Sequence, residues 1–248
     1  MTHPPRFLQS ILAVPQANLP RLRYANWLDG CGNPLGEFIR LQCAAPATPL
    51  LGHERREHQL LNEHQRHWTR LFADCVEWCS FRRGFVEEIA LSDAQLLEHA
   101  PVLFRQAPIF DIHLTSDGKR LDDLGYRPEL SHSVFLDLSS QPFGDDGVER
   151  LAEAPFLAQV HGLNLSSCFI SDFGLDALGE SPHLDGLREL YLNDNPITDE
   201  GIRRLALSPL LERLQDLHVT FTQIGPDSVA LLRRVLGERC AFNTNPKR

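Results

Sequence analysis

One spacing constrains the fold of this chain more than any other feature, because apolar residues recur every 27 positions between residues 134 and 235. The first set is Leu138, Leu165, Leu192 and Val219. Three further sets keep the same period: Leu136, Leu163, Leu190 and Leu217; Phe143, Ile170, Ile197 and Ile224; and Leu151, Leu178, Leu205 and Leu232. A fixed period of about 20 to 50 residues is typical of a repeat array. A single unit of this kind cannot bury its own leucine edge, so neighbouring units must stack into one continuous core.

Each 27-residue unit is predicted to hold a short strand, a turn and a helix. In the unit that begins at Leu187, Thr198 can cap the helix, and Asp199 and Glu200 in its first turn favour the positive end of the helix dipole. The residues expected to end the helices, again 27 apart, are Pro155, Pro182 and Pro209.

Two less regular units precede the array. Val86, Ile89 and Leu91 alternate with more polar neighbours, as in a half-buried strand, and the pattern returns around Ile112. The six predicted strands lie near 86–91, 109–114, 133–138, 160–165, 187–192 and 214–219, and Cys240–Phe242 is expected to add a strand stub over the last edge.

The N-terminal part of the chain, through about residue 80, has a helical pattern. The predicted helices cover Arg6–Val14, a second stretch capped by Asn18 and ended at Gly30, a third starting at Asn33-Pro34, and Leu51–Cys79, with Ala44–Leu50 as a linker. The predicted domains are therefore a helical domain at 1–48, a helical connector at 49–83 and a repeat solenoid at 84–248.

Composition and charge narrow the classes of partner. The net charge of −9 argues against nucleic acid, whose binding needs a clustered basic face, and favours a protein partner with a basic surface. No apolar run is long enough to cross a membrane and the first ten residues hold no apolar signal segment, so we expect a cytoplasmic protein. Its six cysteines lack framework spacing and are expected to be free thiols.

The residues between the core leucines should share the outer face of the predicted sheet, because strand side chains alternate. Aligning the strands gives the columns Glu88, Asp111, Phe135, Gly162, Glu189, Asp216; Ala90, His113, Asp137, Asn164, Tyr191, His218; and Glu87, Phe110, Val134, His161, Arg188, Gln215. The predicted partner-binding residues are Glu88, Phe110, Asp111, His113, Phe135, Asp137, His161, Asn164, Arg188, Glu189, Tyr191, Asp216 and His218. Aromatic residues among acids are typical of a protein-binding face, although a merely solvated face has a similar composition.

The segment Leu187–Ile202, read as LRELYLNDNPITDEGI, resembles the leucine-rich repeat LxxLxLxxNxI followed by a helix. The acids and the glycine after the isoleucine are similar to the ribonuclease-inhibitor and cysteine-containing subtypes, and the last unit departs from them at Pro226 and Ser228. The resemblance implies an α/β solenoid with a parallel concave sheet and convex helices, preceded by a small all-helical domain. It also implies that Cys168 and Asn195, at the asparagine position, satisfy backbone groups of adjacent turns.

A second resemblance covers about Pro5–Cys43. The clusters Phe7–Leu12, Tyr24–Leu28 and Gly36–Gln42 occur in this order in the bacterial repeat-companion domain, a module that accompanies repeat arrays. The family usually has Asp where this chain has Asn26. The resemblance implies a bacterial protein and company with repeats, and it implies no activity.

Function is predicted to be non-enzymatic recognition, as an adaptor that binds a protein through the concave face of the repeats. The sequence has no GxSxG, P-loop, Rossmann glycine pattern or HExxH, so we expect no catalytic residue, metal or cofactor. An inhibitor or immunity factor for a neighbouring enzyme is the alternative.

A metal-dependent hydrolase is the remaining alternative, and it would use the segment 53–79. The potential ligands there are His53, His58, His64, His67, Glu54, Glu57, Glu63, Cys75 and Cys79. A solvated helix face of mixed charge explains the same histidines and glutamates and is the interpretation that we favour.

Overall fold

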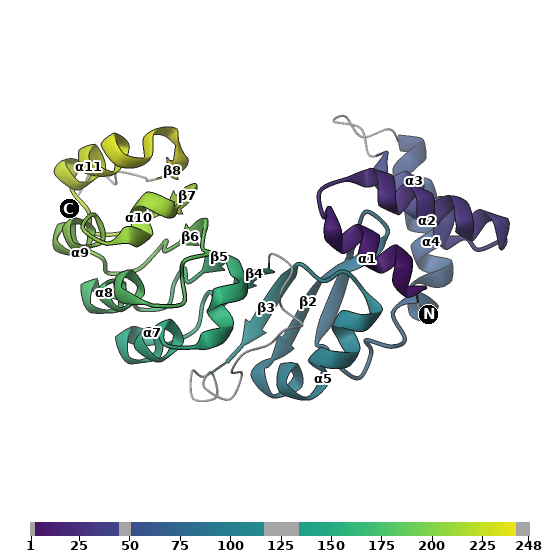
Figure 1. Ribbon diagram of the computed structural model, residues 1–248, viewed down its shortest axis with the longest axis horizontal. Coiled ribbons are helices and arrows are strands. Elements are labelled where there is room, and N and C mark those ends of the chain that lie inside the picture. The colour runs from purple at the N-terminus through teal and green to yellow at the C-terminus, as the bar shows by residue number, and fades with distance from the viewer. Residues whose placement is uncertain (1–2, 45–50, 117–133, 242–248) are drawn as a thin grey trace. The chain divides into compact units, whose positions relative to one another are not determined.

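The computed structural model describes residues 3–44, 51–116 and 134–241 (Figure 1). By its internal contacts the chain divides into unit 1, Met1–Leu91 with Glu98–Phe110, and unit 2, Ser92–Leu97 with Asp111–Arg248. Helices and mostly parallel strands alternate along it, so the predicted α/β class is confirmed. The units divide after Leu91, inside helix α5 (Asp93–Gln106) and after Phe110, whereas the predicted domain boundaries lie at residues 48 and 83.

Unit 1 opens with the predicted helices. They are α1 (Pro5–Ala13), α2 (Asn18–Gly30), α3 (Leu35–Cys43) and α4 (Leu51–Trp68). The prediction that Asn18 caps the second helix is wrong. Asn18 is the first residue of α2, and its side chain donates to the Cys43 carbonyl at 3.1 Å. Helix α2 ends at Gly30 as predicted and is followed by Cys31 as its C-cap, while Gly32 takes the left-handed conformation at φ 65°.

The prediction of a helical connector at 49–83 is wrong for the second half of that segment. After α4, the chain forms β1 (Trp78–Arg82), which pairs antiparallel with β2 (Phe85–Ser92). Arg83 and Gly84 between them both have positive φ, the conformation that two-residue hairpin turns require. Gly84 also lies against α3, where a Cβ atom would come within 2.3 Å of the Ile39 side chain.

The core of unit 1 is built from helices and from β2 together. Its large buried side chains include Ile11, Tyr24, Leu28, Phe38, Ile39, Leu60, Trp68 and Phe85. A buried charge cluster ties α2 to β2: Arg21 is 0 % exposed, and its Nε donates to Glu87 Oε1 at 3.1 Å. Arg83 donates to the other oxygen of Glu87 at 2.8 Å, so the carboxylate is shared by two cations. Such pairing offsets the free-energy cost of removing these charges from water.

Unit 2 contains six described strands that pair in chain order and in parallel. They are β3 (Asp111–Thr115), β4 (Val134–Asp137), β5 (Val160–Asn164), β6 (Glu189–Tyr191), β7 (Asp216–His218) and β8 (Cys240–Ala241). Leu136, Leu163, Leu190 and Leu217 stand opposite one another and are at most 2 % exposed. The strand stub begins at Cys240 as predicted, while Phe242 and the tail lie outside the described residues.

Helices alternate with these strands and form a layer beside them (Figure 1). They are α7 (Gly144–Ala152), α8 (Asp172–Glu180), α9 (Asp199–Leu205), α10 (Pro209–Arg213) and α11 (Pro226–Leu236), with short 3-10 turns at Pro155–Gln159 and Gly237–Arg239. Thr198 caps α9 as predicted, since its hydroxyl accepts from the Glu200 N–H at 3.2 Å.

Asn195 joins neighbouring repeats from a buried position. Its side-chain oxygen accepts from the backbone N–H groups of Cys168 at 3.1 Å and Ile170 at 3.0 Å, and its nitrogen donates to the Leu165 carbonyl at 2.8 Å. The Cys168 thiol makes the equivalent contact, 3.2 Å from the carbonyl oxygen of Leu138 in the preceding turn. Both side chains therefore satisfy buried backbone groups that would otherwise be costly.

A second connection between repeats uses the aspartates at the helix starts. Asp172 accepts from the N–H and the hydroxyl of Thr198 in the next repeat, at 2.8 and 2.5 Å. A Cβ atom on Gly201 would lie 2.3 Å from this carboxylate, which explains the glycine of the motif. In the last repeat Ser228 takes that position and donates its hydroxyl to Asp199 at 2.5 Å, so the departure from the motif keeps the connection.

Candidate functional site

The predicted outer columns align in unit 2, and we call the surface that they form the open face. It comprises Asp111, Phe135, Gly162, Glu189 and Asp216 in one column and His113, Asp137, Asn164, Tyr191 and His218 in the next. These residues alternate with the buried leucines and therefore point to the opposite side of the sheet. Apart from Gly162 their side chains are half-buried or exposed, as a contact surface requires.

Three rings form a cluster across the open face. The rings of Tyr191 and His218 stack with centroids 4.3 Å apart and planes at 21°. Phe135 meets Tyr191 edge to face at 5.7 Å. Gly162 makes this possible, because a Cβ atom there would be 2.3 Å from the Phe135 ring. The glycine therefore lets Phe135 lie across strand β5 toward the other two rings.

Carboxylates surround this aromatic cluster. Glu189 lies 3.5 Å from the Tyr191 hydroxyl, Asp216 lies 3.4 Å from Nε2 of His218, and Asp137 lies 3.4 Å from Nδ1 of His113. Burial, followed by the charges of Glu189 and Asp216, raises the pKa of Tyr191. The phenol is thus a neutral hydrogen-bond donor near negative charges at physiological pH.

The cationic residue of the third column does not neutralise these acids. Arg188 donates to the carbonyls of Asp185 at 2.9 Å and Leu187 at 2.8 Å, which holds its guanidinium at the start of its own strand. His161 is exposed, with Nδ1 3.4 Å from the Gln159 carbonyl. The open face therefore keeps an excess of negative charge.

Four residues assigned to the columns lie in unit 1 and are not part of the open face, namely Glu87, Glu88, Ala90 and Phe110. Phe110 is 9 % exposed, so the prediction of an outward side chain is wrong. The expected outward position of Glu87 is wrong for the same reason, since this carboxylate is buried with Arg21. Glu88 is half-buried and accepts from the Ser80 hydroxyl at 2.6 Å. In unit 1, α2 and β1 supply partners for the side chains of Glu87 and Glu88, which a regular array would expose.

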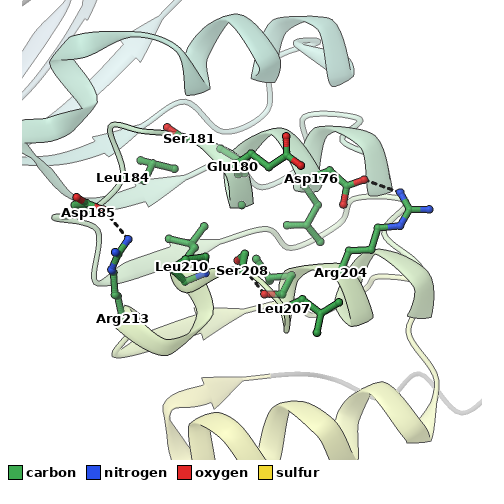
Figure 2. A pocket seen from close by; sticks show the side chains of 15 residues that line it. Asp176, Glu180, Ser181, Leu184, Asp185, Arg204, Leu207, Ser208, Leu210 and Arg213 are labelled. Atoms are coloured by element: carbon green, nitrogen blue, oxygen red, sulfur yellow. Dashed lines mark hydrogen bonds and ion pairs between the residues drawn. The ribbon is translucent and has the colours of Figure 1, made fainter.

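A groove lies on the helix side of unit 2, between α8 and the helices α9 and α10 (Figure 2). Its volume is about 640 Å³, and leucines of the repeat core form its floor. Arg204 pairs with Asp176 at 2.6 Å near one end, and Arg213 pairs with Asp185 at 2.6 Å near the other. These ion pairs join consecutive repeats, so both arginines of this groove already have a carboxylate partner within the chain.

The helices α7 and α8 carry an acidic surface that the sequence interpretation missed. A second groove of about 550 Å³ there is lined by Asp145, Asp146, Glu149, Glu153, Asp176 and Glu180, next to the exposed ring of Phe173. Helical spacing of these acids along 145–180 was the signal that could have identified it. Negative charge is therefore found on both sides of the repeats, whereas the stacked aromatic rings lie on the open face.

The segment 53–79, the alternative metal site, carries its histidines along α4. His64 packs on Trp68 with ring centroids 5.4 Å apart, and His58 contacts the Glu54 carbonyl one helical turn away. Burial raises the pKa of Cys79, which favours the thiol over the metal-binding thiolate. Within the described ranges, no three His, Cys, Asp or Glu side chains are grouped so that they could hold a metal ion.

Comparison with known families identifies one part of the chain. Residues 187–206 match a family model described as Leucine Rich repeat. The match contains β6 and α9 and supports a leucine-rich repeat in this part of unit 2. Repeats of this family are generally protein-interaction motifs, which suggests a non-enzymatic binding module. No curated protein matches the chain. None of the helices in the described part of the chain is long and apolar enough to span a membrane.

Proposed function

We propose that this protein is a non-catalytic recognition module that binds a protein partner through the open face of unit 2. The observation that carries the proposal is the aromatic cluster of Phe135, Tyr191 and His218, half-exposed and surrounded by carboxylates. Aromatic residues on a rigid surface are the usual anchors of protein interfaces. The partner that suits this surface has basic residues and is not a nucleic acid.

The proposal includes the architecture. Residues 84–248 would form one leucine-rich-repeat solenoid of the ribonuclease-inhibitor or cysteine-containing type, with the open face on its concave side. Support comes from the common register of the strands and from the contacts of Asn195 and Asp172 between repeats. Residues 1–48 would be the companion domain of a bacterial, cytoplasmic adaptor. Tyr24 and Arg40 of that domain then serve in packing, since Tyr24 is 1 % exposed and Arg40 pairs with Asp29.

The test compares two double variants of the full chain as bait for affinity capture from the native cell. Tyr191→Ala with Asp137→Lys changes the open face. Phe173→Ala with Asp146→Lys makes the same kinds of change on the helix side, at exposed residues. We expect wild type and the helix-side variant to capture the same protein and the open-face variant to lose it. Equal capture by both folded variants would contradict the proposal.

A further inference from the structure

The open face has the chemistry to select one particular side chain of its partner. We propose that the aromatic cluster with Glu189 and Asp216 binds an arginine side chain of the partner protein. In this arrangement the guanidinium group contacts the rings of Tyr191 and His218 and donates to the two carboxylates. The inference rests on the proposed function, because it assigns the partner's anchor on the same face.

Charge is the first reason. Glu189 and Asp216 are opposite each other on neighbouring strands, directly beside the stacked rings. Each carboxylate has about four acceptor positions, and its contact with the Tyr191 hydroxyl or with the His218 ring occupies one of them. Asp137 adds a third negative charge in the neighbouring column. A cation brought to this surface meets acceptors that still have bonding capacity.

The geometry of the rings is the second reason. Aromatic faces attract cations, and a planar guanidinium also stacks on a ring while its edge donates hydrogen bonds. Tyr191 and His218 lie nearly parallel, with planes at 21°, and Phe135 presents a third ring from the side. The carboxylates lie 3.5 Å from the Tyr191 hydroxyl and 3.4 Å from the His218 ring nitrogen, at the rim of the stack. This combination suits arginine better than lysine, whose ammonium group is a compact point charge.

Among the residues that the structure describes, no arginine or lysine forms an ion pair with Glu189 or Asp216. Arg188 is the arginine of the columns, and its guanidinium is held by the carbonyls of Asp185 and Leu187. Gly162 has no side chain that could project beside the cluster, and the Phe135 ring lies over this glycine. The cluster is thus assembled from three repeats, β4, β6 and β7, with none of its acids paired to an arginine of its own columns.

The experiment selects peptides from a random twelve-residue display library on the full-length protein. We expect arginine to be enriched several-fold among bound peptides relative to the input library. Replacing the enriched arginine of a synthetic peptide by lysine should weaken binding about tenfold. The double variant Tyr191→Leu with His218→Leu should lose the peptide, and the isosteric variant Glu189→Gln with Asp216→Asn should bind it about tenfold more weakly.

The control is Phe173→Leu, which removes an exposed ring from the helix side and should bind the peptide as wild type does. Circular dichroism confirms that each variant is folded. Peptides that need Tyr191 or Asp137 but contain no enriched arginine, or that bind equally with lysine, overturn the arginine inference and leave the proposed function standing. The inference is also overturned if no peptide is recovered, or if the recovered peptides bind all open-face variants as they bind wild type. The proposed function is tested separately by the affinity capture: it is overturned if Tyr191→Ala with Asp137→Lys still captures the cellular partner.

Discussion

Unit 1 and unit 2 use similar elements but hold them together in different ways. In unit 2 the same contacts recur every 27 residues, such as Asp145 with Ser171 and Asp172 with Thr198. In unit 1 the decisive contacts occur once, such as Arg21 with Glu87, which are 66 residues apart in the chain. A periodic contact can be recognised from the sequence because it is repeated, whereas a unique one has no second copy with which to compare it.

The two units can be followed separately in one experiment. All three tryptophans of the chain, Trp27, Trp68 and Trp78, lie in unit 1. Tryptophan fluorescence therefore reports the packing of unit 1 alone, while far-UV circular dichroism reports both units. Each prediction below states which signal should change, beginning with the largest expected effect.

Arg21→Met should destabilise unit 1 by about 4 kcal/mol, because it leaves Glu87 buried with only Arg83 as a partner. Urea unfolding followed by tryptophan fluorescence measures the loss. The double variant Arg21→Met with Glu87→Met should recover much of the stability, since no fully buried charge remains and the partly exposed Arg83 still donates to the Pro15 carbonyl.

The matched control for Arg21 is the exposed ion pair of the same unit, in which Arg56 donates to Glu37 at 2.7 Å. Arg56→Met should change the midpoint far less, because exposed pairs contribute little. Similar losses for Arg21→Met and Arg56→Met would show that the buried cluster does not hold α2 to β2.

Asn195→Ala should destabilise unit 2 by about 3 kcal/mol, since it leaves the buried N–H groups of Cys168 and Ile170 without their acceptor. Circular dichroism should show the loss, and the fluorescence midpoint should move less. Asn164→Ala is the control, because this half-buried side chain accepts one bond, from the Ser166 N–H at 3.1 Å. An equal loss in the control would refute a special role for Asn195 in joining the repeats.

Gly201→Val should cost about 2 kcal/mol, because the new side chain would displace the Asp172 carboxylate that holds Thr198. Gly201→Ser should cost less than half as much, since Ser228 occupies the equivalent position and donates to Asp199. Circular dichroism during urea unfolding measures both. If Gly201→Ser lowers the free energy of unfolding as much as Gly201→Val does, a serine in this repeat does not form the contact that Ser228 makes with Asp199 in the last repeat.

The smallest expected effect is a pH dependence of unit 1. Burial lowers the pKa of His3 to about 4, and its ring lies 2.8 Å from the Tyr24 hydroxyl. The unfolded chain binds a proton near pH 6.5 and the folded chain only near 4, so stability falls as the pH drops through this interval and levels off below it. The slope should stay well below about 1.4 kcal/mol per pH unit, the limit for one proton, because His3 keeps some solvent exposure that screens the effect.

Fluorescence-detected urea midpoints at pH 7.5 and pH 4.5 measure this dependence. His3→Phe should flatten it, and the same substitution at the exposed His67 should not. An unchanged slope in His3→Phe would assign the acid sensitivity of unit 1 to other groups.

Asp199, in unit 2, should respond only at lower pH. The Ser228 hydroxyl and the Gly225 N–H hold the pKa of Asp199 below the usual value. Its contribution to stability is therefore lost as the pH falls through that lowered value.

The open face shows how far the sequence reaches toward a candidate site. Strand alternation and the 27-residue period place Asp137, Tyr191 and His218 in one column, and the structure has them there. The same alignment fails at Phe110, because the packing of unit 1 decides its burial. The ring contact of Phe135 with Tyr191 was also not predictable, since it depends on how Phe135 lies over Gly162.

By itself, the sequence determined the repeats, their register and the side chains that share the open face, because stacked units of equal length bury their leucines only when equivalent residues lie side by side. Tertiary structure alone decided the hairpin of β1 and β2, the burial of Arg21 with Glu87 and the stacking of Tyr191 on His218. These features depend on side-chain volumes and charges brought together from distant parts of the chain, and no local sequence pattern predicts such long-range contacts.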